Sequence, residues 1–236
     1  VPLPTGPYTL PIQILGDVNL ARETIDAGEV GYTGVIGQRA TVNLSVYKNR
    51  TQGLINLLVA ELYTPADPPP GWPLPPDTIA GIPLPKLFQF SSLGDLAEAG
   101  VEAGIDVPVG AGVSASANYS LQTTPELSGP DGAAVPFVVN TPPRHRANLG
   151  LALNRGRFMG SLQASFTDRA FWADVLSYTG WTDSFWLVNG TIGITFGNRR
   201  FTWLVKGTNL ADNAIQQHIF GDIIRRRVMT ELRVKY

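Results

Sequence analysis

Apolar and polar residues alternate along several stretches of the chain, and the final stretch, residues 227–236, shows the pattern from end to end. Successive residues of a β-strand point to opposite faces of a sheet, so this stretch predicts a strand with one face suited to hydrocarbon and one suited to water. The first face holds Val228, Thr230, Leu232, Val234 and Tyr236, and the second holds Arg227, Met229, Glu231, Arg233 and Lys235. The last residues therefore form an amphipathic strand that closes on an aromatic side chain.

The same alternation predicts eight further strands, so the chain is expected to be all-β. They span residues 23–34, 40–50, 95–107, 111–122, 145–153, 157–170, 184–196 and 200–209. Residues 1–22 contain Pro at positions 2, 4, 7 and 11 and no sustained period, which predicts a loop before the first strand. Residues 23–236 then form an antiparallel sheet of about nine to ten up-and-down strands.

The connections between these strands alternate strictly in length. The short ones are 35–37, 108–110, 154–156 and 197–199, and the long ones are 52–93, 123–143, 171–183 and 210–224. Transmembrane β-barrels of the bacterial outer membrane have short periplasmic turns and longer extracellular loops, so the alternation favours such a barrel. The competing interpretation is a soluble β-sandwich binding module, in which the outward aliphatic residues would form a dry core between two sheets.

In the barrel interpretation, the short turns face the periplasm together with the C-terminus, and the long loops are extracellular. Several aromatic residues lie close to short turns or to the C-terminus, on the face assigned to lipid. Aromatic residues gather where a membrane protein meets the lipid headgroups, so these predict a periplasmic girdle. Its members are Phe158, Phe196, Phe201, Trp203 and Tyr236.

Composition narrows the function classes. Net charge is -1 and charged residues are 16% of the chain, so no global field points to nucleic acid. The absence of cysteine excludes disulfides, thiolate metal sites and a cysteine nucleophile. No apolar run approaches the roughly 20 residues of a membrane helix. Nine is an odd number, whereas single-chain bacterial barrels are even, so we expect the C-terminal part of a larger barrel or one strand hidden in residues 1–22.

No arrangement of residues indicates catalysis, a metal site or a cofactor. Glu98 and Glu102 are four residues apart on one predicted strand, about 13 Å, which exceeds the roughly 5–9.5 Å between the carboxyls of a glycosidase. They fit a polar lumen wall better. The two histidines, His145 and His218, have no neighbouring ligand set, and no histidine is positioned beside Ser161 to form a triad.

Candidates for ligand binding come from the lumen face and from the long loops. Exposed loop tryptophans can stack on a sugar or an aromatic ligand, or they can pack their own loops. Arginines at the loop end can hold an anionic substrate or a lipopolysaccharide phosphate, or remain solvated. The candidates are Glu98, Glu102, Trp72, Trp172, Trp181, Arg225 and Arg226.

Three stretches resemble the C-terminal barrel half of the TonB-dependent outer-membrane receptors. Leu20–Tyr32 is similar to the family's Arg-Glu pair followed by Glu-x-Gly-Tyr, and Leu93–Glu102 to its strand with a Gly-Val-Glu core. Val205–Asp222, followed by the strand from Arg227, resembles the closing Asn-Leu, loop and final strand. The resemblance covers nearly the whole chain from about residue 20.

The resemblance implies a barrel of about 22 strands whose lumen is filled by a plug domain. It implies energised uptake of a scarce ligand, of the siderophore, cobalamin, carbohydrate or peptide class, without bond chemistry. The implied partners are outer-membrane lipid, the plug and remaining strands, which lie outside this sequence, and the TonB complex acting through the plug. The alternative within the membrane is a small self-contained barrel that serves as an adhesin or a passive pore.

Overall fold

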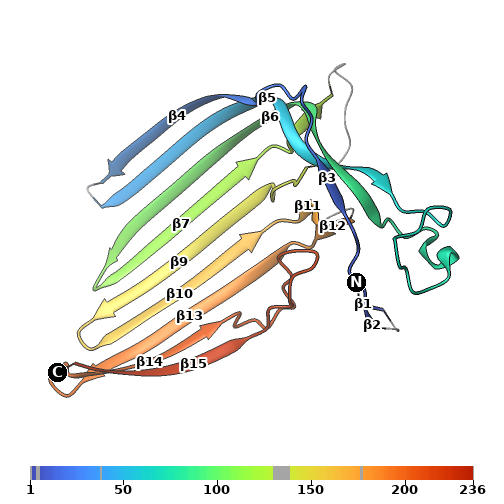
Figure 1. The fold of residues 1–236 in the computed structure, drawn as a ribbon. Helices are drawn as coiled ribbons and strands as arrows, with labels where there is room; N and C mark the ends of the chain where they lie inside the picture. Colours follow the sequence, from blue (N-terminus) through green and yellow to red (C-terminus); the bar gives the residue numbers. More distant parts are fainter. Residues whose placement is uncertain (1, 4–5, 38, 130–138, 176–177, 236) are drawn as a thin grey trace.

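A computed structural model describes residues 2–3, 6–37, 39–129, 139–175 and 178–235. Nine strands follow one another in a single antiparallel sheet, each paired with the next in chain order (Figure 1). They are β4 (Thr24–Ile36), β5 (Ala40–Leu62), β6 (Pro85–Gly110), β7 (Val113–Gln122), β9 (His145–Arg155), β10 (Phe158–Thr167), β13 (Phe185–Phe196), β14 (Phe201–Thr208) and β15 (Arg227–Val234). The nine predicted strands are confirmed. In the described part of the chain, no helix is both long and apolar enough to cross a membrane.

The registers join the apolar faces of the separate strands into one surface. One cross-strand row runs through Val42, Ile105, Ala117, Leu149, Ala164 and Val188. These residues are apolar without exception, and the alternation within each strand places them on its apolar side. The neighbouring row on the other face begins Asn43, Gly104, Asn118, Asn148, Ser165. The sheet therefore has one apolar face and an opposite face that is mostly polar, with Leu187 and Leu204 among the exceptions.

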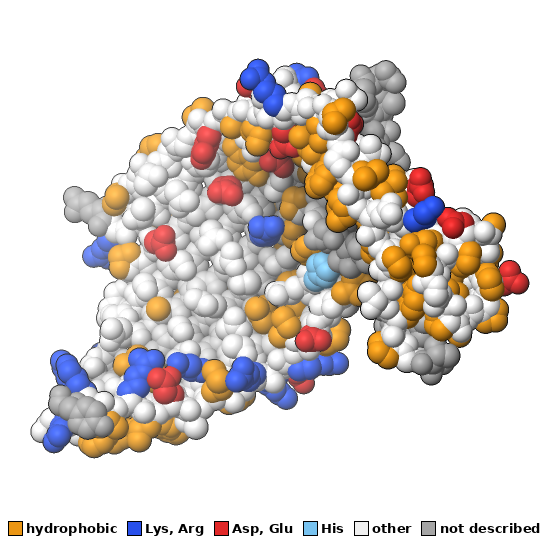
Figure 2. All heavy atoms as spheres, viewed as in Figure 1, with side chains coloured by type: hydrophobic (Ala, Val, Ile, Leu, Met, Phe, Trp, Pro, Cys, Tyr) orange, Lys and Arg blue, Asp and Glu red, His pale blue; other side chains and the backbone are white. Residues whose placement is uncertain are grey.

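The apolar face is uncovered by protein. Val30, Ile192 and Leu232 on this face are 79%, 69% and 60% exposed. In the described residues, no second sheet packs on it, so the interpretation as a soluble sandwich with a dry core is wrong. Figure 2 looks onto the opposite face, which is hollowed and mostly polar. A sheet that is polar inside its curve and apolar outside has the pattern of a wall of a membrane barrel.

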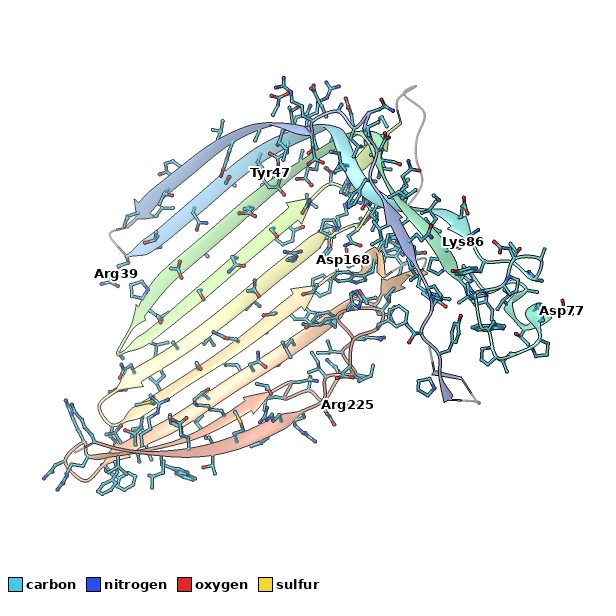
Figure 3. The ribbon with its side chains drawn as sticks, in the orientation of Figure 1. Arg39, Tyr47, Asp77, Lys86, Asp168 and Arg225 are labelled. Carbon is cyan, nitrogen blue, oxygen red and sulfur yellow. The ribbon has the colours of Figure 1, made fainter. Side chains whose placement is uncertain are left out.

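Short and long connections lie at opposite ends of the sheet, as expected. Turns 37–39, 111–112, 156–157 and 197–200 are at the left in Figure 1, with the C-terminus. The described residues of connections 63–84, 123–144, 168–184 and 209–226 are at the other end. Figure 3 labels one residue from each, Arg39 at the short-turn end and Arg225 at the loop end. β4 and β15 are the edge strands, so the sheet is open.

Two strands are longer than the sequence pattern indicated. Residues 52–93 were expected as one connection, but β5 continues to Leu62 and β6 begins at Pro85. That expectation was wrong because the pairing of β5 with β6 shifts register between Thr51 and Leu54 and again near Val59. Each shift inserts a residue into the alternation, so the strand loses its period of two. The turn after β6 is likewise at 111–112, and Pro108 lies within the strand.

Several connections contain short strands of their own. In the segment expected as loop before the first strand, β1 (Pro2–Leu3) pairs with β2 (Gly6–Pro7), and β3 (Gln13–Leu15) pairs in parallel with β6. In the later connections, β8 (Glu126–Ser128) also pairs with β6, and β11 (Ala170–Val175) forms a hairpin with β12 (Tyr178–Thr182). The loop end is therefore built of ordered structure in these segments.

Connection 63–84 folds into a small lobe with its own core. Tyr63, Ile79 and Leu84 are buried together, and Leu10 and Trp72 pack against them. The Tyr63 hydroxyl donates a hydrogen bond to the carbonyl of Pro11 at 2.8 Å, which attaches the N-terminal segment to the lobe. A 3-10 turn, η1 (Pro76–Ile79), carries the most deeply buried of these residues.

Replacing Gly94 by alanine is expected to detach β8 from β6. Gly94 has a φ of +111°, and a Cβ placed there would lie 1.9 Å from the carbonyl oxygen of Ser128. The close contact opposes a side chain at this position, and the backbone strain of a non-glycine residue there destabilises the folded state by about 1–3 kcal/mol. Amide exchange at Leu127 should become faster. Gly28→Ala is the matched control, since its Cβ would meet nothing within 4 Å; equal exchange in both variants would contradict the prediction.

Candidate ligand-binding surface at the loop end

Two neighbouring loops meet through their aromatic side chains at the loop end. The Trp172 and His218 rings are 4.6 Å apart, and those of Tyr178 and Phe220 are 5.8 Å apart. A Cβ on Gly180 would lie 3.2 Å from the Ile219 side chain, so the β11–β12 hairpin and connection 209–226 pack closely. We call Trp172, Tyr178, Trp181, His218 and Phe220 the aromatic rim.

Much of the aromatic rim remains open to solvent. Phe220, Trp181 and Tyr178 are 61%, 46% and 41% exposed. The Arg169 guanidinium carbon lies 4.7 Å from the centre of the Trp181 ring, and Phe171 packs at 5.3 Å on the same ring. Exposed rings held in place by neighbours can stack on a flat or conjugated ligand without a large loss of side-chain entropy.

A buried asparagine closes the base of connection 209–226. Asn209 is fully buried, and its Nδ2 donates to the carbonyls of Asn213 at 2.8 Å and of Ile224 at 3.1 Å. The Ile215 and Ile224 backbones pair beside it. Its backbone N–H donates to Asn189 Oδ1 on β13 at 3.1 Å. These bonds join the start and the end of the connection and attach both to the sheet.

The predicted arginines lie at the foot of the same connection. Arg226 donates its backbone N–H to Asp212 Oδ1 at 2.9 Å, and its guanidinium is 3.8 Å from the Asp212 carboxylate. Arg225 reaches the carbonyl of Asp212 at 3.4 Å. Asp212 therefore partly compensates both cations. Both arginines are exposed and directly follow Ile224 in the chain.

The three predicted loop tryptophans have different environments. Trp172 and Trp181 belong to the aromatic rim. Trp72 lies in the 63–84 lobe instead, where its ring meets that of Tyr8 edge-on at 5.2 Å and its Nε1 donates to Thr78 at 3.2 Å. The lobe is further held by Lys86, which contacts Asp67 at 2.8 Å. The hydrogen bonds that the Lys86 ammonium donates to Asp67 and Glu61 raise the pKa of Lys86 above its ordinary value.

Both predicted glutamates lie on the polar face. Glu98 is half-buried and accepts hydrogen bonds from Asn49 at 3.0 Å and from Gln122 at 2.8 Å. Glu102 is exposed and opposes Ser45 and Ser120 in the register. Glu98 is thus part of a hydrogen-bonded network on the polar face, and Glu102 lies on the same face. In the described part of the chain, no group of three His, Asp or Glu side chains could hold a metal ion.

Four of the five predicted girdle residues lie together near the short turns. Phe158, Phe196 and Trp203 are 53%, 45% and 49% exposed, and Phe201 stacks on Phe196 at 5.5 Å. The Trp203 indole N–H donates to Thr230 at 2.7 Å, which fixes the ring along the sheet. The fifth predicted residue, Tyr236, lies outside the described residues.

A second aromatic belt near the loop end was missed in the sequence. Phe166 and Trp186 lie on the apolar face with ring centres 5.2 Å apart, and Tyr119 hydrogen-bonds His145 at 2.7 Å. Phe166 and Phe158 are eight residues apart on β10, about 27 Å along a strand or about 20 Å of height at a tilt near 40°. This is close to the roughly 25 Å apolar band of outer-membrane barrels. Counting aromatics at both strand ends would have found the belt.

Comparison with known protein families identifies the family of barrels to which this sheet belongs. A family model described as TonB dependent receptor-like, beta-barrel, matches residues 3–210. The chain belongs to the TonB-dependent receptors. This family is located in the bacterial outer membrane and consists of receptors and transporters. No curated protein sequence matches the chain significantly.

Solved structures of TonB-dependent receptors share the fold at low sequence identity. The copper transporter OprC matches 91% of this chain with 30% of its own, at 14% identity and a TM-score of 0.62. The FrpB iron transporter from Neisseria meningitidis (F3-3 variant) matches 93% of this chain with 32% of its own chain, at 11% sequence identity and a TM-score of 0.61. The siderophore receptor PirA from Acinetobacter baumannii matches 94% of this chain with 33% of its own chain, at 12% sequence identity and a TM-score of 0.62. This TonB-dependent receptor chain thus spans about a third of their length.

Proposed function

We propose that this chain is the C-terminal part of an outer-membrane receptor barrel that takes up a scarce ligand with energy from the TonB complex. The observation that carries the proposal is the family match over residues 3–210, on a sheet with an apolar outer and a polar inner face. A plug domain fits against the polar face, which offers hydrogen-bonding groups such as Glu98, Gln163 and Asn189. The mechanism is binding and gating, without bond chemistry.

The loop end is proposed as the extracellular receptor surface and the short turns as the periplasmic end. The aromatic rim and Arg169 give this surface stacked rings beside a cation. Such a surface suits a flat, conjugated or anionic ligand, as many metal chelates are. Structural neighbours are named as copper and iron transporters and siderophore receptors, so a metal ion or metal chelate is the first ligand class to test.

Uptake in cells tests the proposal. A strain lacking the gene should lose uptake of one member of a panel containing Cu²⁺, cyanocobalamin and the ferric complexes of a catecholate and a hydroxamate chelator. The intact gene should restore it, and a protonophore should abolish it. Uptake that persists with the protonophore would favour the passive pore, and no difference for any compound would contradict receptor function for these ligands.

A double substitution tests the rim. Trp181→Ala with Phe220→Ala should weaken binding of the ligand so identified about 10-fold or more, since each ring supplies about 1–3 kcal/mol of stacking in comparable sites. Binding is measured on the purified, intact gene product. Trp72→Ala is the matched control, because Trp72 packs within the 63–84 lobe. An equal loss in both variants would remove the rim from the proposal.

A further inference from the structure

Positive charge gathers at the short-turn end of the sheet and carboxylates are missing there. Residues 37–39, 108–114, 154–158, 196–201 and 232–235 contain no Asp or Glu. Their cations, which we call the basic collar, are Arg39, Arg155, Arg157, Arg199, Arg200, Arg233 and Lys235. In Figure 2, blue side chains accordingly appear both beside the β4–β5 turn and around the C-terminus.

The opposite end has the reverse balance. Connections 63–84, 123–144, 168–184 and 209–226 hold four arginines, Arg144, Arg169, Arg225 and Arg226. Their acids are Asp67, Asp77, Glu126, Asp131, Asp168, Asp174, Asp183, Asp212 and Asp222. The net charge of -1 therefore conceals a chain that is polarised along the strand direction. The near-zero net charge of the whole chain therefore does not describe the charge at either end of the sheet.

The collar cations are held on tight turns and are mostly uncompensated. Backbone bonds of 2.8 Å join Thr195 to Arg157 and Lys235 to Arg200, so the turns are anchored to their neighbours. Every collar residue is exposed. Among the described residues, only Arg233 has a carboxylate partner, Glu231. Clustered like charges repel one another, so a collar in which one of seven cations has a carboxylate partner among the described residues favours binding of anions from outside the chain.

The collar borders the apolar face directly. The Arg157 guanidinium carbon is 5.8 Å from the centre of the Phe158 ring, and Arg155 opposes Phe158 across the β9–β10 turn. Aromatic girdles lie at the level of the lipid headgroups, and long basic side chains beside them reach headgroup phosphates. Arginine pairs with phosphate through two hydrogen bonds, and clusters of basic residues beside a membrane attract anionic lipid.

We propose that the basic collar binds the phosphates of anionic phospholipids, such as phosphatidylglycerol, in the leaflet that the short turns enter. The inference rests on the proposed function only in requiring the barrel to sit in a bilayer. The collar is spread along the rim of the sheet and begins where the apolar face ends, which matches a ring of lipid. A compact acidic protein would contact only one section of such an arc.

Trp203 provides a local reporter, because it lies in the girdle on the lipid-facing side. The intact gene product is reconstituted in phosphatidylcholine bilayers containing an equal fraction of either brominated phosphatidylglycerol or brominated phosphatidylcholine. Bromine quenches tryptophan on contact, and Trp203→Phe isolates the signal of this ring. Phosphatidylglycerol should quench about twofold more than phosphatidylcholine at low salt, and the excess should shrink at high salt.

Charge-matched variants separate the collar from general electrostatics. Arg155→Gln, Arg157→Gln and Arg199→Gln combined should bring the two quenching values together. Arg225→Gln, Arg226→Gln and Arg227→Gln combined remove the same charge at the loop end and should leave the excess unchanged. Heat-dependent gel migration reports folding of both variants, and Arg157→Gln alone should give a partial loss if the triple collar variant does not fold.

Four results would overturn the inference. Equal quenching of the unsubstituted protein by both lipids would show that the collar does not select anionic headgroups. Displacement of the excess by millimolar inorganic phosphate would show a site for soluble anions. An excess that survives in the folded collar variant would assign the selection to other residues. If uptake is not lost in the deletion strain but phosphatidylglycerol still quenches more strongly than phosphatidylcholine, the proposed receptor function alone is refuted. If neither lipid quenches Trp203, both the lipid-binding inference and the membrane barrel that it requires are refuted.

Discussion

Leu151→Arg should destabilise the folded barrel by about 2–4 kcal/mol, whereas Ala152→Arg, one residue later on β9, should cost much less. Leu151 lies on the apolar face, opposite Ala115 on β7 and Leu162 on β10, and is 52% exposed in the sheet. In a bilayer that exposed half contacts hydrocarbon. A guanidinium near the middle of the membrane loses its hydration unless it reaches an interface.

The control tests the face assignment directly. Ala152 opposes Ser114 and Ser161, so an arginine there enters the polar face. Both variants of the intact gene product are folded into lipid vesicles and unfolded reversibly with denaturant, and the free energies of unfolding are compared. A loss for Ala152→Arg as large as that for Leu151→Arg would contradict the assignment of the two faces.

The face assignment is also the part of the fold that the sequence predicts best. In stretches such as 149–153 and 192–196, large apolar residues occupy every second position, so period-two reasoning finds both the strand and its lipid side. The registers then align faces that had been assigned strand by strand. Local alternation suffices here because every strand crosses the same slab of hydrocarbon, which imposes the pattern on each one separately.

Outside the hydrocarbon region, the alternation of apolar and polar residues no longer predicts the structure. Leu54–Leu62 continues β5 through further register shifts, and its apolar residues, interrupted at Asn56 and Glu61, follow no period of two that would reveal the strand. The β11–β12 hairpin is short, and its position depends on packing against connection 209–226. Trp172 and His218 are distant in the sequence, so neither predicts the other. The aromatic rim is therefore visible only in three dimensions, although two of its tryptophans were found as candidates.

Asn209→Gly should destabilise the closed form of connection 209–226 by about 1–3 kcal/mol while leaving the sheet folded. Its side-chain amide satisfies the carbonyls of Asn213 and Ile224 in a fully buried site. Glycine removes both hydrogen bonds, each of which contributes about 0.5–1.5 kcal/mol, while the Ile224 carbonyl keeps the bond that it accepts from the Ile215 N–H. Glycine is the informative replacement because Asn209 has a φ of 49°, which glycine adopts without strain. The effect then belongs to the lost amide.

Amide hydrogen exchange measures the expected opening. The amides of Ile215 and Ile224, which pair with each other, should exchange about 30-fold faster or more in Asn209→Gly, as a change of about 2 kcal/mol implies. Asn213→Ala is the control, since it removes one exposed hydrogen bond to Trp186 and keeps the Asn213 carbonyl. Unchanged exchange at Ile224 in Asn209→Gly would refute the role of the amide.

The same opening should reach the ligand surface, because His218 and Phe220 lie between the two points that Asn209 joins. If the rim binds the ligand, Asn209→Gly should weaken binding although Asn209 is buried and outside the rim. Asn209 belongs to the Asn-Leu pair that supported the family resemblance in the sequence, and its side-chain hydrogen bonds give this pair a structural role. It holds the closing loop in the shape that presents the aromatic rings, and loss of affinity without loss of barrel stability is its expected signature.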